Sequence, residues 1–299
     1  MPDPTAAARS VLCHTDCMSD STAADTPYNA APDSTTSEAV HRSAEILHRA
    51  TQRQEQLAEL PVDAAPTTRA AAYAVQARLT ELSHQPTVGW KIAATSAAGQ
   101  RHINVDGPLG GRVLEDRVHP DGAEVSLTGN MMQLAEPEFV FVLGTSLAPQ
   151  PEPYGAHQIM DAVSDLRLGI ELPSTRFTDV TAVGALQLIA DSACGHHFVL
   201  GPSVRAGWRE LNLSKVHMSA AVNGPSGHRE IAGRGANVLG NPVTALTWLV
   251  NELSELGIGL EAGTFVTTGT CSDPIPVRVG DTITADFDGL GTVTCALTA

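Results

Sequence analysis

The sequence predicts an α+β fold in which helices flank a β-rich core. Strand-like runs cluster in the middle of the chain and again at its end, without the regular alternation with helices that βαβ units require. Helical patterns with an apolar stripe occur instead at residues 35–85 and 241–257. With 299 residues, the chain is long enough for one large domain or two.

The N-terminal part divides into a tail and a helical region. Residues 1–36 are rich in Ala, Ser, Thr, Asp and Pro and carry few large apolar side chains, so we expect them to be disordered. A helical N-terminal cap region is predicted over residues 37–85. Its first helical stripe ends at Pro61, and its second helix covers residues 67–83. Residues 86–299 form the predicted β-rich core, which carries the candidate catalytic residues.

Lys91 stands in the middle of an apolar, strand-like segment, residues 88–96. Two interpretations are open. In the first, its ammonium reaches the surface along its own aliphatic stem. In the second, the ammonium has a functional role and either holds a substrate carboxylate or transfers a proton. The turn cluster at residues 107–111 is rich in glycine, but no GK[ST] motif follows it and no strand–GxGxxG–helix unit occurs. Nucleotide binding is therefore not supported.

Three glutamates lie at the ends of two apolar strands. Glu136 and Glu138 directly precede the apolar run 139–143, and side chains two apart on a strand lie on the same face. Glu171 lies at the end of a second strand, residues 166–172, facing away from its apolar side. Buried carboxylates repel one another unless a cation lies between them, although a solvated strand end is the alternative. Three oxygen ligands without a thiolate or paired imidazole predict a site for Mg²⁺ or Mn²⁺.

The apolar run 182–190 ends at Asp191, and small residues follow it. We expect a compact loop that reaches into a cleft, with Asp191 either as an acid of the site or as a helix N-cap or Asx-turn residue. His196 and His197 are adjacent, so on a strand they would point to opposite faces and not share one site. At most one of them is catalytic, and we assign that role to His197.

The C-terminal part combines one helix with three strands. Asn241 and Pro242 begin the helix as N-cap and first-position proline, and Gly257 ends it. The predicted strands are residues 265–269, 282–287 and 292–297.

Charge and cysteine content limit the partners. A formal net charge of −15 argues against nucleic acid and anionic membrane surfaces. No apolar run approaches the roughly 18 residues of a membrane-spanning helix, and we expect no secretory leader. The five cysteines are odd in number and scattered, which fits a reduced, cytoplasmic protein. An anionic substrate would need positive charge supplied locally by a metal, a lysine or an arginine.

Several motifs occur in a specific order along the chain. They are Gly89-Trp90-Lys91-Ile92 with Thr95-Ser96, Glu136-Pro137-Glu138, Glu171-Leu172-Pro173-Ser174-Thr175-Arg176, Ile189-Ala190-Asp191 and Thr268-Gly269. Over about residues 38–299, the set resembles the 2-keto-4-pentenoate hydratase family of the fumarylacetoacetate hydrolase-like superfamily. The resemblance implies a mixed β-roll or β-sandwich core with flanking helices, bound Mg²⁺ or Mn²⁺, and a homo-oligomer. It also implies a small anionic 2-oxo or 2-hydroxydienoic acid as substrate, from the catabolism of aromatic compounds.

The resemblance assigns roles residue by residue. Glu136, Glu138 and Glu171 match the metal ligands, Lys91 the active-site lysine, and Asp191 an active-site acid. The candidate substrate-binding residues are Thr95, Ser96, Ser192, Thr268 and Gly269. The chain departs from the family after Asp191, where the family often has Asn and then small residues before a Phe/Tyr-Val-Leu-Gly end. This chain has Ser192 and His196-His197 there.

The implied reaction is hydration of a 2-hydroxy-2,4-dienoate, by protonation to the enone and addition of water at C4. Decarboxylation of a 2-oxo-3-enedioate is the alternative, and it would need an extra cation for the second carboxylate. A catalytically silent, ligand-binding member is a third possibility, and C–C bond hydrolysis is the least favoured. Arg176 either binds substrate or pairs with an acid at the strand end, and we favour the pairing.

Overall fold

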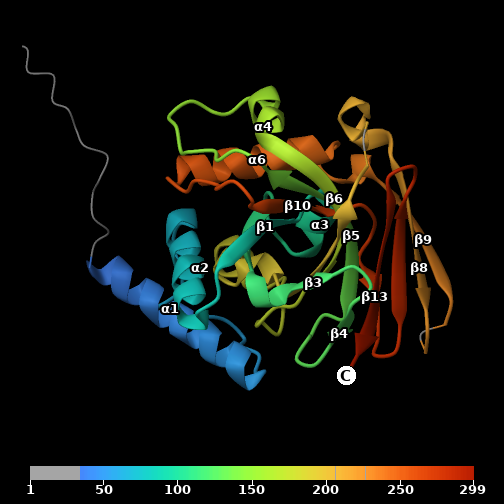
Figure 1. Cartoon of the computed structure of the whole chain (residues 1–299). Coiled ribbons are helices and arrows are strands. Elements are labelled where there is room, and N and C mark those ends of the chain that lie inside the picture. The colour runs from blue at the N-terminus through green and yellow to red at the C-terminus, as the bar shows by residue number, and fades with distance from the viewer. Residues whose placement is uncertain (1–33, 206, 226) are drawn as a thin grey trace, which may run out of the picture. The chain divides into compact units, whose positions relative to one another are not determined.

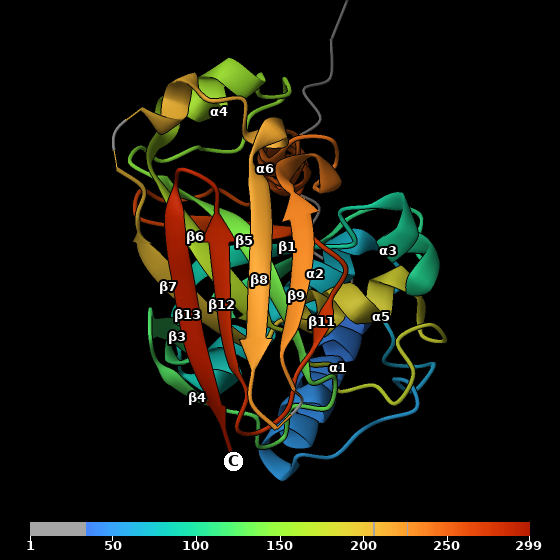
Figure 2. The same cartoon turned by 90° about the vertical axis from the view of Figure 1, so that its right-hand side faces the viewer.

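The strands are arranged in two mixed β-sheets with helices around them (Figures 1 and 2). The structure, a computed structural model, describes residues 34–205, 207–225 and 227–299. The helices are α1 Ser34–Arg53, α2 Arg69–Ser83, α3 Ala97–His102, α4 Ala156–Ala162, α5 Gly184–Ala190 and α6 Pro242–Glu255, with short 3₁₀ turns η1 Glu115–Arg117, η2 Ser192–Cys194, η3 Trp208–Glu210, η4 Leu213–Lys215 and η5 Gly235–Asn237. The strands are β1 Thr87–Ala93, β2 Leu109–Leu114, β3 Val118–Pro120, β4 Glu124–Ser126, β5 Leu134–Leu143, β6 Val163–Leu172, β7 His197–Ser203, β8 His217–Asn223, β9 Arg229–Arg234, β10 Phe265–Thr270, β11 Ile275–Pro276, β12 Thr282–Phe287 and β13 Gly291–Thr298.

The larger sheet has the strand order β2-β1-β10-β5-β6-β7-β3, and β11 also pairs with β5. The smaller sheet has the order β4-β13-β12-β8-β9. Parallel pairs, such as β1 with β10 and β3 with β7, occur beside antiparallel ones, such as β5 with β6. The predicted α+β class with a β core is therefore confirmed.

The two faces of the larger sheet have different neighbours. One face packs into the main core, where Phe139 meets Phe287 of the smaller sheet edge-on at 5.0 Å between ring centroids. The other face carries Lys91, the three glutamates and a separate apolar cluster that includes Phe198 and Phe265, whose rings stack at 5.6 Å. The candidate site and this small cluster therefore share one face of the sheet.

Two glycines make room for the rings of that cluster. A Cβ on Gly89 would lie 2.5 Å from the Phe265 ring, and a Cβ on Gly169 would lie 2.8 Å from Cε1 of Phe198 and closer still to its Cζ. Real Cβ atoms do not approach so closely, so any larger residue would displace the rings. The glycines let the aromatic rings lie flat against the sheet beside the site.

Helix α2 is bound to the core by a buried glutamine. Thr68 caps the helix by accepting a hydrogen bond from the Ala71 N–H at 3.1 Å. The Gln76 amide donates to the carbonyls of Gly110 and Ile189 at 2.9 and 2.6 Å, and its oxygen accepts from the Arg112 N–H at 2.9 Å. This side chain therefore joins α2 to both β2, at the edge of the larger sheet, and α5.

Two N-terminal boundaries differ from the prediction. Helix α1 ends at Arg53, well before Pro61, because Gln54 adopts a left-handed conformation (φ 54°) that stops the helix. Residues 1–33 of the predicted tail lie outside the described residues, and residues 34–36 belong to α1. Residues 34–299 form one compact unit, so the division between a cap region and a core at residue 85 stays a prediction.

The C-terminal predictions are confirmed. Asn241 caps α6 by accepting the Val243 N–H at 2.9 Å, and strands β10, β12 and β13 cover the three predicted runs. Strands β8 and β9 and the short helices α3 and α4 were not predicted. The three described cysteines, Cys194, Cys271 and Cys295, are free thiols. Within the described part of the chain, no helix is both long and apolar enough to cross a membrane.

Candidate metal and active site

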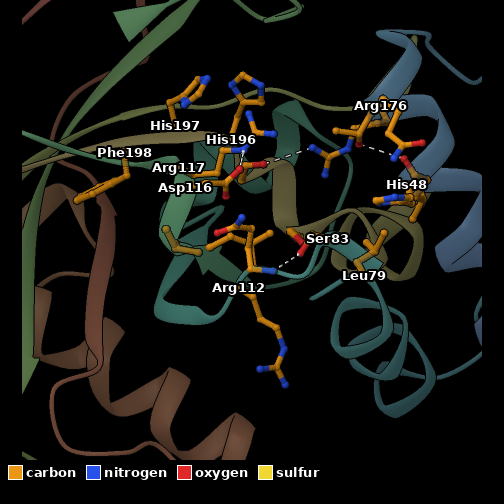
Figure 3. Close-up of a pocket in the computed structure, with 18 of the residues that line it drawn as sticks. His48, Leu79, Ser83, Arg112, Asp116, Arg117, Arg176, His196, His197 and Phe198 are labelled. Carbon is orange, nitrogen blue, oxygen red and sulfur yellow. Dashed lines mark hydrogen bonds and ion pairs between the residues drawn. The ribbon is translucent and has the colours of Figure 1, made fainter. Parts of the chain in front are cut away.

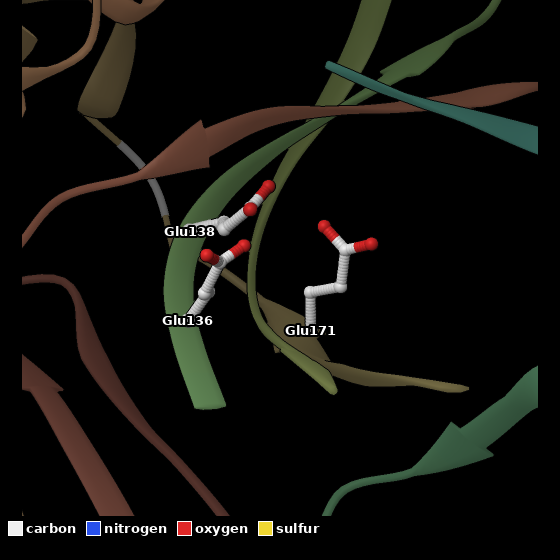
Figure 4. A group of neighbouring side chains, drawn as sticks. All are labelled: Glu136, Glu138 and Glu171. Carbon is white, nitrogen blue, oxygen red and sulfur yellow. The ribbon is translucent and has the colours of Figure 1, made fainter. Parts of the chain in front are cut away.

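The pairing of β5 with β6 brings three carboxylates together. Glu136 lies directly opposite Glu171 across the two antiparallel strands, and Glu138 is two residues further along β5 on the same face. One oxygen from each of the three lies within 4.8 Å of the others, and Figure 4 shows Glu136 and Glu138 on one strand with Glu171 beside them on its neighbour. Glu138 and Glu171 are buried and Glu136 is partly buried. The predicted convergence of the three glutamates is therefore present.

The surroundings of this triad fit a cation. Oε1 of Glu138 and Oε2 of Glu171 are buried and have no hydrogen-bond partner among the described residues. Loss of hydration, with repulsion from Glu171, raises the pKa of Glu136 to about 7 and the pKa of Glu138 well above its usual range. Buried oxygens without partners are costly, and a shared divalent ion would satisfy them. The hard oxygen donors suit Mg²⁺ or a similar cation.

Lys91 is buried beside the triad, which excludes the surface-reaching interpretation. Its side chain is 2% exposed, and its Nζ lies 3.1 Å from Oε1 of Glu171. The same ammonium donates a 2.7 Å hydrogen bond to the carbonyl of Ala193. Burial alone would lower the pKa of Lys91, but the carboxylates of Glu171, Glu136 and Glu138 outweigh it and raise the pKa above its usual value. The lysine therefore remains charged, a single ammonium facing three acids.

A bulge in β10 supports Glu138. Thr267 pairs with Val140 and Thr270 with Glu138, so two β10 residues oppose one residue of β5. Gly269 in the bulge has φ 93°, and its N–H donates to Oε2 of Glu138 at 2.8 Å. The Thr267 hydroxyl donates to the same oxygen. Thr267 was not predicted as a site residue, and its position before Thr268-Gly269 was the only available signal.

Asp191 is engaged by the residues that follow β6. Its carboxylate accepts from the Thr175 hydroxyl at 2.8 Å, from the Arg176 N–H at 3.0 Å and from the Arg176 guanidinium. The guanidinium also donates to the carbonyls of Asp191 (2.6 Å) and Gly195 (3.4 Å). Burial raises the pKa of Asp191, although Arg176 opposes the shift. The favoured pairing of Arg176 with an acid is therefore confirmed.

The turn that Arg176 spans is left-handed over three residues. Ser192, Ala193 and Cys194 have φ values of 52°, 51° and 63°, although none of them is glycine. This geometry directs the Ala193 carbonyl at Lys91. On the opposite side, a Cβ on Gly111 would lie 2.6 Å from the Ser192 carbonyl carbon, so only glycine fits there. Arg176 and Asp191 thus fix the carbonyl that orients the lysine.

The predicted substrate-binding residues lie around the triad in different settings. The Thr268 hydroxyl donates to the Phe139 carbonyl at 3.1 Å, and Thr95 is buried against Gly269. Ser96 caps α3 by accepting the Gly99 N–H at 3.0 Å. Ser192 alone among the five lines the cavity described next. Their substrate-binding roles stay predictions.

A cavity of about 300 Å³ includes Glu171 of the triad in its wall. Figure 3 shows side chains that line this cavity. Both His196 and His197 line it, with ring centroids 4.2 Å apart. The prediction that these histidines cannot share a site is therefore wrong. Strand β7 begins only at His197, so the alternation of a strand does not separate the two side chains.

Two further cavity features were missed in the sequence. His119 lies in β3, which runs beside β7, and its Nε2 is 2.9 Å from Nδ1 of His197. Arg117, from the preceding 3₁₀ turn, also lines the cavity. Burial, followed by the charge of Arg117, lowers the pKa of His197 to about 4, so this ring is neutral at pH 7.

Comparison with known proteins identifies the family. Residues 93–298 match the model for the fumarylacetoacetate (FAA) hydrolase C-terminal domain. The chain belongs to the FAA hydrolase family, as the sequence resemblance predicted.

Within that family, the chain is similar to enzymes named as hydratases. It is 31% identical to a 2-keto-4-pentenoate hydratase of Burkholderia vietnamiensis over 76% of this chain and 85% of that protein. It is 30% identical to the TodF product hydratase of Pseudomonas putida over 86% of this chain and 95% of that protein.

The fold agrees with a solved structure, the 4-oxalocrotonate decarboxylase of Pseudomonas putida G7 complexed with magnesium and adipate. The TM-score is 0.77 at 27% identity, over 87% of this chain and 98% of that one. The predicted FAA hydrolase-type core with flanking helices is thereby confirmed.

Proposed function

We propose that this protein is a divalent-metal-dependent hydro-lyase that hydrates a 2-hydroxy-2,4-dienoate to a 4-hydroxy-2-oxo acid in the catabolism of aromatic compounds. The names of the similar proteins support the reaction class. The observation that carries the proposal is the triad of glutamates with partnerless buried oxygens beside buried Lys91. Mg²⁺ or Mn²⁺ is the proposed cofactor, and the magnesium in the similar decarboxylase supports it.

A divalent cation held by Glu136, Glu138 and Glu171 would supply positive charge for the carboxylate and 2-oxygen of a 2-oxo acid. In the proposed reaction C5 of the dienoate gains a proton and the 2-hydroxyl loses one, which gives a 2-oxo-3-enoate. Water then bonds to C4 through its oxygen, and a proton is added at C3. The Nζ of Lys91 offsets the negative charge of the substrate or donates a proton to carbon.

His197 and Asp191 receive different roles in this proposal. His197 lines the cavity as a neutral imidazole oriented by His119, and it is our candidate to accept the proton of the attacking water. The Asp191 carboxylate is fully buried and occupied by Arg176 and Thr175. We therefore propose Asp191 as a positioning residue, which acts on Lys91 through the left-handed turn, instead of a base.

Decarboxylation of a 2-oxo-3-enedioate is the second candidate, because the similar solved structure is a decarboxylase. Loss of CO₂ would leave the same dienolate that protonation consumes, so one set of side chains serves either reaction. A catalytically silent member has less support, since the triad and Lys91 are all present.

One assay distinguishes the hydratase, the decarboxylase and the catalytically silent protein. Purified protein with Mg²⁺ is incubated with 2-hydroxypenta-2,4-dienoate and, separately, with 2-oxohex-3-enedioate, while dienol absorbance and CO₂ release are followed. Loss of dienol absorbance without CO₂ supports the hydratase, whereas CO₂ release from the second acid supports the decarboxylase. No turnover of either acid with Mg²⁺ or Mn²⁺ would refute both.

The remaining parts of the proposal concern assembly and location. We propose a cytoplasmic homo-oligomer whose only partner is its small anionic substrate. The family resemblance supports the oligomer, and the net charge of −15 argues against nucleic acid and anionic membranes. Light scattering on the purified protein tests the oligomeric state.

A further inference from the structure

The cavity beside the triad gathers three arginines in a chain that is strongly acidic overall. The whole chain has a formal net charge of −15. The ionisable residues in the cavity wall are Arg112, Arg117, Arg176, His48, His196, His197, Asp116 and Glu171. Guanidinium groups in a cavity wall offer charged N–H donors to an anion, so the question is which of the three is available.

Of the three arginines, two are not placed to bind an anion beside the histidines. Arg176 is bound to Asp191 and to backbone carbonyls, so it would have to break these contacts. Arg112 lies over the ring of Trp90 at 4.6 Å, and its Nε has no hydrogen-bond partner among the described residues. In Figure 3, however, its side chain extends away from the two histidines.

Arg117 is the arginine that remains available. Its only charged partner among the described residues is the adjacent Asp116, whose carboxylate lies 3.4 Å from Nε of Arg117 and is 41% exposed. An exposed pair of this kind is weak and exchanges readily with water or another anion. The guanidinium still has donors free to bind a carboxylate in bidentate geometry.

The neighbours of Arg117 do not neutralise it. The charge of Arg117 contributes, after burial, to the lowered pKa of His119, His196 and His197. These rings are therefore neutral, with one N–H each. One N–H of the His119–His197 pair is used between the two rings, whereas the N–H of His196 can donate to an anion. Nδ1 of His196 has no hydrogen-bond partner among the described residues. Arg117 and His196 thus form a small group of donors, opposed only by exposed Asp116.

We propose that this protein prefers a substrate with a second carboxylate at its far end, and that Arg117 binds that carboxylate with His196 as a neighbouring donor. The inference rests on the proposed function, which holds the 2-oxo acid end at the triad. Glu171 belongs to both the triad and the cavity wall, so the remainder of the substrate extends into the cavity. Sequence alone did not identify a cation for a second carboxylate, and Arg117 supplies it.

The test compares two substrates that differ only at the far end: 2-hydroxyhepta-2,4-diene-1,7-dioate and 2-hydroxyhepta-2,4-dienoate. The wild-type protein with Mg²⁺ should have the higher kcat/KM for the dioate. Arg117→Gln should lower that value by about 10- to 100-fold, mainly through KM, as expected for a lost charge-assisted hydrogen bond. The monocarboxylate should lose much less than the dioate, since this substrate makes no such bond. Arg205→Gln, at an exposed arginine outside the cavity, is the matched control and should leave both values unchanged.

Equal losses on both substrates in Arg117→Gln, or a wild-type preference for the monocarboxylate, would overturn the inference while leaving the proposed function intact. If neither acid is turned over, direct binding decides the inference, and the assay with 2-hydroxypenta-2,4-dienoate still decides the proposed function. Calorimetry then compares heptanedioate with heptanoate on the Mg²⁺-loaded protein. Weaker heptanedioate binding to Arg117→Gln than to Arg205→Gln supports the dicarboxylate pocket. Equal binding refutes it.

Discussion

Replacing Gly269 with alanine should damage both the fold and the metal site. Gly269 has φ 93°, a conformation that costs an L-residue about 1–2 kcal/mol. The new Cβ would lie 2.7 Å from Cγ2 and 2.9 Å from Cβ of buried Thr95, and such overpacking costs about 1–3 kcal/mol. We expect Gly269→Ala to lower the free energy of unfolding by about 2–5 kcal/mol, the sum of these terms.

The variant should also weaken Mg²⁺ binding, because the Gly269 N–H that orients Glu138 would have to move. Gly263 provides a matched control: its φ is 89°, yet no heavy atom lies within 4 Å of the Cβ position. Gly263→Ala should therefore cost only the conformational part, about 1–2 kcal/mol, and leave Mg²⁺ affinity unchanged. Urea unfolding and calorimetric Mg²⁺ titration measure the two effects. Equal losses of stability in both variants, with unchanged Mg²⁺ affinity in Gly269→Ala, would refute this reasoning.

Three further predictions concern charge. Glu138→Gln should abolish divalent-metal-dependent turnover and the rise in Tm on adding Mg²⁺. Its circular dichroism spectrum should stay unchanged, which shows that the fold is intact. Full activity of this variant after chelator treatment would contradict the assignment of Glu138 as a metal ligand. Lys91→Met leaves Glu171 without its cation, so we expect about 3–5 kcal/mol of destabilisation in urea unfolding of the metal-free protein. Turnover should fall by about 10²- to 10⁴-fold. A variant with wild-type stability and rate would disprove the proposed role of Lys91 in charge compensation and proton transfer. The pKa values of His196 and His197 are lowered to about 2 and about 4, so below about pH 6.5 these two residues bind up to two more protons in the unfolded chain than in the folded one. Their contribution to stability is therefore complete above that pH and should fall by up to about 2.7 kcal/mol per pH unit on acidification toward pH 4. The raised pKa values of Glu136 and Glu138 act in the opposite direction, so the measurement is the difference in slope between the wild type and a double His→Asn variant at these positions.

Alternation along single strands was enough to predict most of the metal site. Glu136 and Glu138 are two apart, so their shared face follows from strand geometry alone. Glu171 was recognisable because it ends an alternating run. What the sequence could not supply was the register that sets Glu171 opposite Glu136, because register depends on contacts between strands and not on either strand separately.

Residues brought in by distant pairing were missed for the same reason. His119 meets His197 from 78 positions away, through the parallel pairing of β3 with β7. Arg117 directly precedes β3, so the same pairing places it in the cavity wall. No neighbouring sequence motif indicates that it is a site residue. Both histidines at 196–197 were assigned to a strand that includes only the second, so strand alternation was applied one residue too early.

The missed elements have weak local signals. Strands β8 and β9 contain Ala220, Ala221, Ala232 and Gly233, which have low β propensity, and their order comes from pairing with β12 and with each other. Helices α3 and α4 have six and seven residues, too short to show an amphipathic period. Helix α1 was extended too far because the apolar stripe continues past Gln54, where the backbone turns away.

The run of three left-handed residues at 192–194 has a consequence for how this enzyme can evolve. Each of these residues adopts a backbone conformation that glycine would adopt at lower cost, so glycine there would relieve strain in the folded chain. The same change would make the backbone at the Ala193 carbonyl, which accepts the hydrogen bond of Lys91, more flexible. At these positions, selection for stability therefore favours glycine, whereas selection for turnover favours the present residues. Variants from hot and cold habitats should differ there before they differ at the acids themselves.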